Sequence, residues 1–137
     1  MNADALKNGI DYIAIGEGEE TIRELLTTIR EGRSPDAVAG IAFMRGEHVV
    51  RTATREPVTD FSRLPLPDFY LLRYARVTLF PVGWTRGCGM DCEFCTVKGK
   101  PRSASVERVV EQIASLLETH HARHFFIVDD LFGHRRD

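Results

Sequence analysis

The sequence predicts an α/β protein in which short buried strands alternate with amphipathic helices. Three largely apolar runs, at residues 10–15, 77–84 and 124–128, have the hydrophobicity of strands that are covered on both faces. Residues 19–31 and 105–118 carry apolar side chains at the spacing of a helix that buries one side. With 137 residues, 43% of them hydrophobic, the chain can form one or two small domains with a core.

Residues 1–52 are predicted to end a doubly wound domain. A short helix is expected at residues 3–7, before the turn Asn8-Gly9. The strand at 10–15 is expected in a parallel sheet. The segment Gly16-Glu17-Gly18-Glu19 is then expected to turn the chain into the helix at 19–31.

The helix at 19–31 is predicted to bury an apolar stripe and to stop near Gly32. Two short strands, at 40–44 and 48–52, follow on either side of Arg45-Gly46-Glu47, as in a β-hairpin. The residues of the predicted stripe are Ile22, Leu25, Leu26 and Ile29.

Residues 53–76 are predicted to link two domains. At their centre lies Leu64-Pro65-Leu66-Pro67-Asp68. Prolines at alternate positions favour an extended, stiff chain, so the domain boundary is expected in this segment.

Residues 77–137 are predicted to begin a (β/α) barrel. The strand at 77–84, a loop, a helix capped by Ser105 and the strand at 124–128 follow one another as in the first unit and a half of such a fold. Chemistry in these barrels gathers at the C-terminal ends of the strands. The loop after residue 84 and the pair Asp129-Asp130 both lie at such ends. The predicted apolar face of the helix consists of Val106, Val109, Val110, Ile113, Leu116 and Leu117.

Composition excludes several classes of protein. The net charge of −2 gives no basic surface for nucleic acid. The apolar runs are too short to span a membrane, and the N-terminus does not have the pattern of a signal peptide. An odd number of clustered cysteines argues against a secreted disulfide framework, so a reducing cytoplasm is the expected location.

All three cysteines of the chain lie on one short segment, Cys88-Gly-Met-Asp-Cys92-Glu-Phe-Cys95. Three thiolates can hold three irons of a cubane [4Fe-4S] cluster and leave the fourth iron open to a substrate. Zinc is an alternative, but structural zinc usually takes four ligands in paired knuckles. A redox dithiol of Cys92 and Cys95 is another, but it leaves Cys88 unexplained.

The motif Cys88-x3-Cys92-x-Phe94-Cys95, preceded by Thr85-Arg86-Gly87, resembles the signature of the radical S-adenosylmethionine (SAM) superfamily. The resemblance implies a [4Fe-4S] cluster on the three cysteines, whose open iron chelates the amino and carboxylate groups of SAM. One electron then cleaves SAM to methionine and a 5′-deoxyadenosyl radical, which abstracts hydrogen from a small-molecule substrate. The resemblance to this superfamily also implies a reductant such as flavodoxin or ferredoxin. Phe94 would lie beside the adenine, or it is a core aromatic under the loop.

The order of the remaining segments is similar to that of radical SAM proteins with a cobalamin-binding domain. Residues 11–21, with Gly16, Glu17 and Gly18, would end a Rossmann-like cobalamin domain near the nucleotide tail of the cofactor, or they only shape a turn. Residues 77–137 would be the first units of the radical SAM barrel. Asp129 and Asp130 resemble the motif that meets the amino end of SAM, or they are caps of a loop.

Two departures from this family affect the expected function. The Asp-x-His-x-x-Gly motif, whose histidine can ligate cobalt, is absent from the sequence. A complete barrel takes on the order of 200 residues or more, so the chain is expected to be an incomplete piece of a longer enzyme. The expected reaction is cobalamin-assisted methyl transfer or a rearrangement. The alternatives are a non-catalytic iron–sulfur or metal-binding module and a degenerate fragment.

Overall fold

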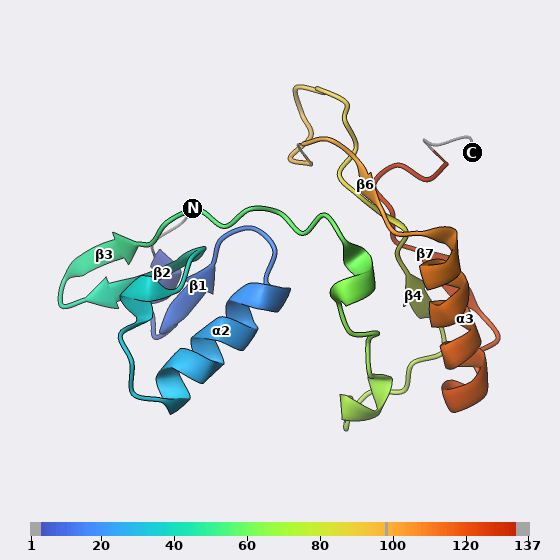
Figure 1. Ribbon diagram of the computed structural model, residues 1–137, viewed down its shortest axis with the longest axis horizontal. Helices are drawn as coiled ribbons and strands as arrows, with labels where there is room; N and C mark the ends of the chain where they lie inside the picture. The colour runs from blue at the N-terminus through green and yellow to red at the C-terminus, as the bar shows by residue number, and fades with distance from the viewer. Residues whose placement is uncertain (1–3, 98, 134–137) are drawn as a thin grey trace. The chain divides into compact units, whose positions relative to one another are not determined.

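The computed structural model describes residues 4–97 and 99–133, which form two compact units (Figure 1). The units comprise residues 1–58 and 59–137, so the division falls inside the segment that we expected to be a linker. Each unit combines helices with a small sheet, and the predicted α/β class is confirmed. No helix in the described ranges is long and apolar enough to cross a membrane.

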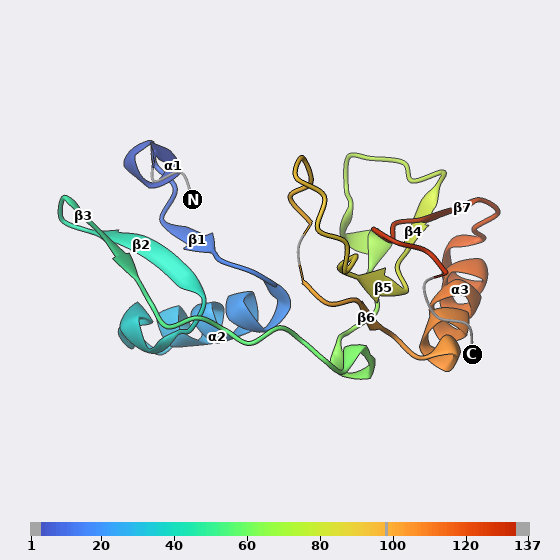
Figure 2. The ribbon, with the colours of Figure 1, turned by 90° about the horizontal axis from the view of Figure 1, so that it is seen from above.

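The first unit contains a three-stranded antiparallel sheet in the order β1-β2-β3, against which the helix α2 packs (Figures 1 and 2). The predicted hairpin is confirmed as β2 and β3, in which Phe43 lies opposite Val50. The core joins Leu25 of α2 to Val38, Ile41 and Phe43. The elements are α1 (Asp4–Lys7), β1 (Tyr12–Ala14), α2 (Glu19–Arg30), the 3-10 helix η1 (Pro35–Ala37), β2 (Ile41–Arg45) and β3 (His48–Arg51). The first residue of the predicted helix at 3–7 lies outside the described residues.

The prediction of a parallel strand at 10–15 is wrong. β1 has only three residues and pairs antiparallel with β2, Ile13 opposite Ala42. Its apolar flanks are open, because Ile10 is 49% and Ile15 is 37% exposed. A continuous apolar run suggested two covered faces, but both ends of this run stay open to solvent although α1 and α2 each pack beside the sheet.

The buried face of α2 also differs from the predicted stripe. Leu25 is buried as expected, but Ile22, Leu26 and Ile29 are about half exposed. The residues that accompany Leu25 into the interior are Thr21 and Thr28. Thr21 and Thr28 each precede an expected position by one residue while Leu25 is common to both sets, so the buried face is rotated by less than the roughly 100° that separates successive residues. Thr21 Oγ1 donates to the Glu17 carbonyl at 3.2 Å, in the turn before the helix, whereas Thr28 Oγ1 is buried and has no hydrogen-bond partner among the described residues.

The second unit is built on a parallel pair of strands, β4 and β7, joined through the helix α3 (Figure 1). Phe80 lies opposite Phe125 and Val82 opposite Ile127, so a strand–helix–strand crossover is present as predicted. Its core consists of Phe80, Val82, Leu116 and Ala122. The elements are the 3-10 helices η2 (Phe61–Arg63) and η3 (Phe69–Leu71), then β4 (Phe80–Val82), β5 (Thr85–Arg86), β6 (Arg102–Ser103), α3 (Val106–His120) and β7 (Phe125–Ile127).

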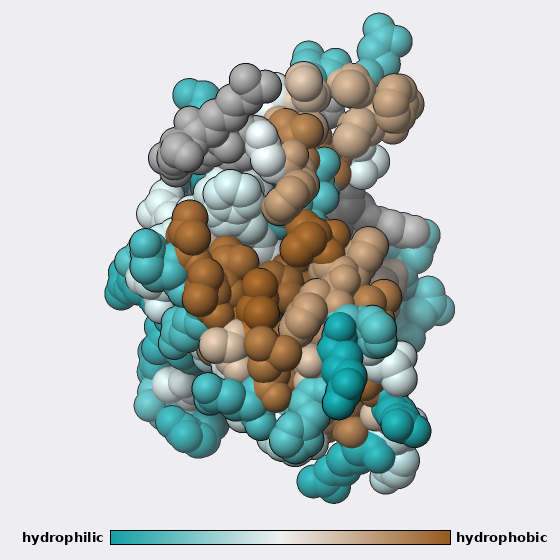
Figure 3. Space-filling view, turned by 90° about the vertical axis from the view of Figure 1, so that its right-hand side faces the viewer, coloured by the Kyte–Doolittle hydropathy of each residue, from teal (hydrophilic) through white to brown (hydrophobic). Residues whose placement is uncertain are grey.

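The helix α3 begins where the sequence predicted. Ser105 caps it, because its Oγ accepts a hydrogen bond from the Arg108 N–H at 3.1 Å. It ends at His120, two residues later than expected, and His121 follows in the left-handed conformation with φ 52°. Only part of the predicted apolar face is covered: Leu116 is buried, but Val106, Val110 and Leu117 are 48–61% exposed. Figure 3 shows hydrophobic residues gathered on the face that carries α3 and β7.

Residues 59–76 are folded onto the second unit. The Phe69 ring meets Phe80 edge-on at 5.2 Å between centroids, and the Tyr70 hydroxyl donates to the Thr119 carbonyl. Two aspartates start the turns of this segment: Asp60 accepts from the Ser62 N–H and Asp68 from the Tyr70 N–H, each at 3.0 Å. Bonds from the Ser62 hydroxyl and N–H hold the pKa of Asp60 below its usual value. The segment is therefore more ordered than the extended chain that its prolines suggested.

Candidate functional site

The cysteine loop is closed at its base by a short ladder that the sequence did not reveal. β5 pairs antiparallel with β6, with Thr85 opposite Ser103 and Arg86 opposite Arg102. The Thr85 and Ser103 hydroxyls add a hydrogen bond of 3.2 Å. Residues 87–97 and 99–101, which include all three cysteines, belong to the loop between these strands (Figures 1 and 2). Strands of two residues leave no periodic pattern, which is why this pairing was missed.

Two glycines let the ends of the loop lie against each other. Gly87 has φ 83°, and a Cβ there would lie 3.0 Å from the Lys100 carbonyl oxygen. Gly89 has φ 74°, and a Cβ there would lie 2.9 Å from Cδ of Pro101. The Gly89 N–H also donates to the Gly99 carbonyl at 3.1 Å. Both positions therefore require glycine for backbone conformation and for space, and the close approach that they allow is to the returning arm of the loop.

The three cysteines are present as thiols. Cys88 and Cys95 are half-buried, and Cys92 is exposed. The Cys95 N–H donates to the Cys92 carbonyl at 3.2 Å, which forms a tight turn between these two. Three thiols on one loop are a donor set that fits the cubane cluster. In the described part of the chain, however, no three Cys, His, Asp or Glu side chains are gathered closely enough to hold a metal ion.

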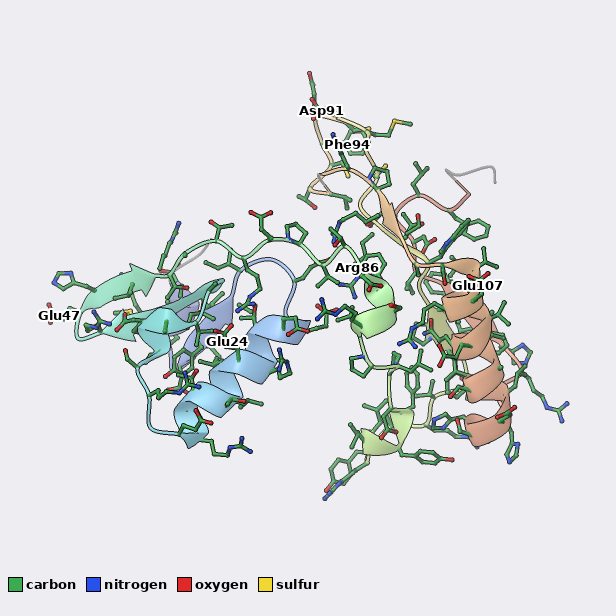
Figure 4. All side chains as sticks on the ribbon, viewed as in Figure 1. Glu24, Glu47, Arg86, Asp91, Phe94 and Glu107 are labelled. Atoms are coloured by element: carbon green, nitrogen blue, oxygen red, sulfur yellow. The ribbon has the colours of Figure 1, made fainter. Side chains whose placement is uncertain are left out.

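Phe94 lies on the outer part of the loop, near Asp91, and is 91% exposed (Figure 4). The alternative that it is a core aromatic under the loop is therefore wrong. An aromatic ring that is almost entirely exposed has no packing role of its own and is available to stack on a flat ligand.

Asp129 and Asp130 follow β7 and contact the chain that leads into the loop. Oδ1 of Asp129 accepts hydrogen bonds from the Trp84 N–H at 2.7 Å and from the Thr85 N–H at 2.9 Å. Oδ2 of Asp130 accepts from the Gly87 N–H at 3.2 Å. Oδ2 of Asp129 is buried and has no hydrogen-bond partner among the described residues. The strand ends of β4 and β7 thus bring the carboxylates and the cysteine loop together, as the sequence predicted.

The ring of Phe61 contacts two arginines at the base of the loop. The guanidinium carbons of Arg86, which is labelled in Figure 4, and of Arg102 lie 5.1 Å and 5.7 Å from the centre of the buried Phe61 ring. Such cation–π contacts are worth about 0.5–2 kcal/mol each. Nearby, Trp84 donates from Nε1 to the Ala104 carbonyl at 2.9 Å and meets the Phe132 ring edge-on. Sequence reasoning missed Phe61, whose partners are more than twenty residues away.

Gly16, Glu17 and Gly18 lie in the first unit, in the turn between β1 and α2. Gly16 has φ 87° with open space beside it, and Gly18 is the N-cap residue of α2. Oε2 of Glu17 accepts a hydrogen bond from the Val58 N–H at 2.6 Å. Each residue has a structural role in shaping or bracing the turn.

Known proteins resemble the chain in sequence and fold. It is 30% identical over 132 residues to an uncharacterized methyltransferase from Pyrococcus horikoshii, covering 90% of this chain and 29% of the relative. Its fold matches that of the cobalamin-dependent S-adenosylmethionine radical enzyme OxsB with aqua-cobalamin and S-adenosylmethionine bound, with a TM-score of 0.70 and 26% identity over 88% of this chain and 18% of that one. It also matches the radical S-adenosylmethionine methyltransferase TsrM from Kitasatospora setae with cobalamin and a [4Fe-4S] cluster bound, with a TM-score of 0.67 and 20% identity over 90% of this chain and 27% of that one.

The chain spans about a quarter of the length of the curated relatives it matches. No protein-family model matches it.

Proposed function

Because the chain is related over most of its length to cobalamin-dependent radical SAM enzymes, we propose that Cys88, Cys92 and Cys95 ligate a [4Fe-4S] cluster that binds SAM. The observation that carries the proposal is the loop itself. It holds all three cysteines of the chain, it is closed by β5 and β6, and it starts just beyond the C-terminal end of β4. Cys88, Cys92 and Cys95 would hold such a cluster, and once reduced by an external donor it would supply the one electron needed for the reductive cleavage of SAM.

The residues around the loop would hold the two ends of SAM. The exposed ring of Phe94 is free of core packing, so it can lie against the adenine. Asp129 and Asp130 lie at the end of β7, on the side of the sheet from which the loop starts, so the amino end of SAM would lie near them. Binding of the cluster would draw the three thiols together. Metal binding often orders its own ligands, and all three ligands lie on one loop here.

The whole protein would use this radical for methyl transfer or a rearrangement assisted by cobalamin. It would work in the cytoplasm with flavodoxin or ferredoxin as the reductant. Gly16, Glu17 and Gly18 would lie near the nucleotide tail of cobalamin, where small residues permit a close approach of the cofactor. The open space beside Gly16 is compatible with this role. The sequence supplies no Asp-x-His-x-x-Gly histidine for the cobalt.

The alternative is a module that binds a metal without catalysis. It would use the same three free thiols, which are a donor set that zinc also accepts. Zinc bound by the same thiols would distinguish this function from radical chemistry.

Anaerobic reconstitution tests the proposal. We expect about four irons and four sulfides per chain, an EPR signal on reduction, and a change of that signal on addition of SAM. Replacing any one cysteine with alanine should remove most of the cluster, whereas Glu93→Ala, an exposed change in the same loop, should leave it intact. Stoichiometric zinc with no cluster would favour the metal-binding module. A fully loaded cluster whose EPR spectrum does not change on addition of SAM would contradict the proposed SAM site but not the proposed cluster ligands.

A further inference from the structure

We propose that Asp129 and Asp130 are positioning residues that fix the path of the chain into the cysteine loop. This inference rests on the proposed function of that loop, and it assigns the two carboxylates a role that exists before SAM binds. The juxtaposition comes from the fold, because the aspartates follow β7 while the groups that they hold follow β4.

The first step of the argument concerns backbone groups that the sheet leaves without partners. The β4–β7 ladder ends near Val82, whose carbonyl accepts from the Val128 N–H at 3.0 Å. The N–H groups of Trp84 and Thr85 lie just beyond it, and Thr85 is buried. Buried N–H groups must find an acceptor. Oδ1 of Asp129 accepts from both, at 2.7 Å and 2.9 Å, and so replaces the missing strand.

The second step concerns the residue next to the first cysteine. Oδ2 of Asp130 accepts from the Gly87 N–H at 3.2 Å, and Gly87 precedes Cys88. Consecutive carboxylates therefore hold three N–H groups within residues 84–87. Hydrogen bonds to ionised acceptors are about twice as strong as neutral ones, so this arrangement restrains the start of the loop more than ordinary turn contacts would.

The third step separates a positioning role from a direct contact with SAM. Oδ2 of Asp129 is buried, and Oδ1 already has two donors. The oxygen that carries the interaction therefore faces the backbone and acts on the cysteine loop through it. Loss of this acceptor should affect the protein in the absence of SAM, which a residue that only binds SAM would not do.

The experiment compares Asp129→Ala, Asp129→Asn and Asp130→Ala with the exposed control Glu118→Ala, all without SAM. Amide hydrogen exchange is measured in the cluster-free chain, and iron content is measured after anaerobic reconstitution. We expect exchange at Trp84 and Thr85 to rise by about tenfold in Asp129→Ala and to be largely restored in Asp129→Asn, because an amide oxygen still accepts both bonds. Asp130→Ala should raise exchange at Gly87 alone. Asp129→Ala should also lower iron content without SAM.

Amide exchange at Leu116, which is buried in the core, reports whether a variant has unfolded as a whole. If Asp129→Ala unfolds, the exchange rates of Asp129→Asn and Asp130→Ala test the inference instead. Unchanged exchange at residues 84–87 in a folded variant would overturn the inference, as would full iron content without SAM in Asp129→Ala. If the unaltered chain forms no cluster, the proposed function fails, and the exchange results still decide whether the carboxylates hold the chain.

Discussion

Truncation of Leu116 tests whether α3 is fixed to the parallel strands as described. Leu116 is 3% exposed and lies in a core cluster with Phe80, Val82 and Ala122. Leu→Ala at such a site costs about 2–5 kcal/mol, from lost transfer free energy and from the cavity that remains. A unit the size of residues 59–137 typically has about 4–12 kcal/mol of stability, so Leu116→Ala should remove a large part of it.

The neighbouring Leu117 provides a matched control. The substitution Leu117→Ala removes the same atoms from the same helix as Leu116→Ala. The Leu117 side chain, however, is 48% exposed and lies about 100° further around the helix axis. We expect Leu117→Ala to cost less than about 1 kcal/mol. The assay is urea unfolding of the 137-residue chain followed by circular dichroism, with the m-value checked for each variant. Equal losses for the two variants, or a larger loss for Leu117→Ala, would refute the packing of α3 on β4 through Leu116.

Three further changes test the loop, the end of α3 and the segment before β4. Gly89→Ala should lower the iron content of the reconstituted protein, because the new methyl group meets a proline ring at 2.9 Å; Gly133→Ala, at a similar φ in open space, should leave it unchanged. His121→Gly should raise the free energy of unfolding by up to about 1 kcal/mol, measured with urea, since φ 52° strains a residue with a Cβ; a loss would contradict the left-handed cap. Hydrogen bonds from Ser62 hold the pKa of Asp60 below its usual value, so the stabilising effect of this carboxylate is present above the usual carboxyl pKa and is lost as pH falls through the lowered pKa. In Asp60→Asn, the free energy of unfolding should therefore fall less steeply with decreasing pH in this range, and an unchanged pH dependence would contradict this.

The elements that the sequence predicted well are those set by local chemistry. Ser105 begins α3 because a serine hydroxyl accepts from the first turn, and the hairpin strands lie on either side of Gly46 because the turn needs φ 59° there. The relation to the radical SAM superfamily followed from a motif of adjacent residues, and that to the proteins with a cobalamin-binding domain followed from the order of segments along the chain; the relatives confirm both.

The features that the sequence did not predict depend on partners far along the chain. The direction of β1 is set by its pairing with β2, which no property of residues 10–15 encodes. α2 buries Thr21 and Thr28 although Ile22 and Ile29 are more apolar, because the position of the sheet decides which face is covered. In the site, Oδ1 of Asp129 accepts hydrogen bonds from N–H groups that lie more than forty residues earlier in the chain, and no sequence pattern reveals such a contact.

Because the short β5–β6 ladder closes the cysteine loop, the length of this loop can change without moving the rest of the second unit. Arg86 and Arg102 are paired across the β5–β6 ladder. This pairing fixes the distance between the two ends of the loop, whatever the number of residues between them. Lengthening a loop whose ends are already joined costs little, about 0.6 kcal/mol for each doubling of its length. Insertions between Gly89 and Gly99 would therefore leave the parallel strands β4 and β7 in place. The segment between these two glycines could also be replaced by the corresponding segment of another protein of this class.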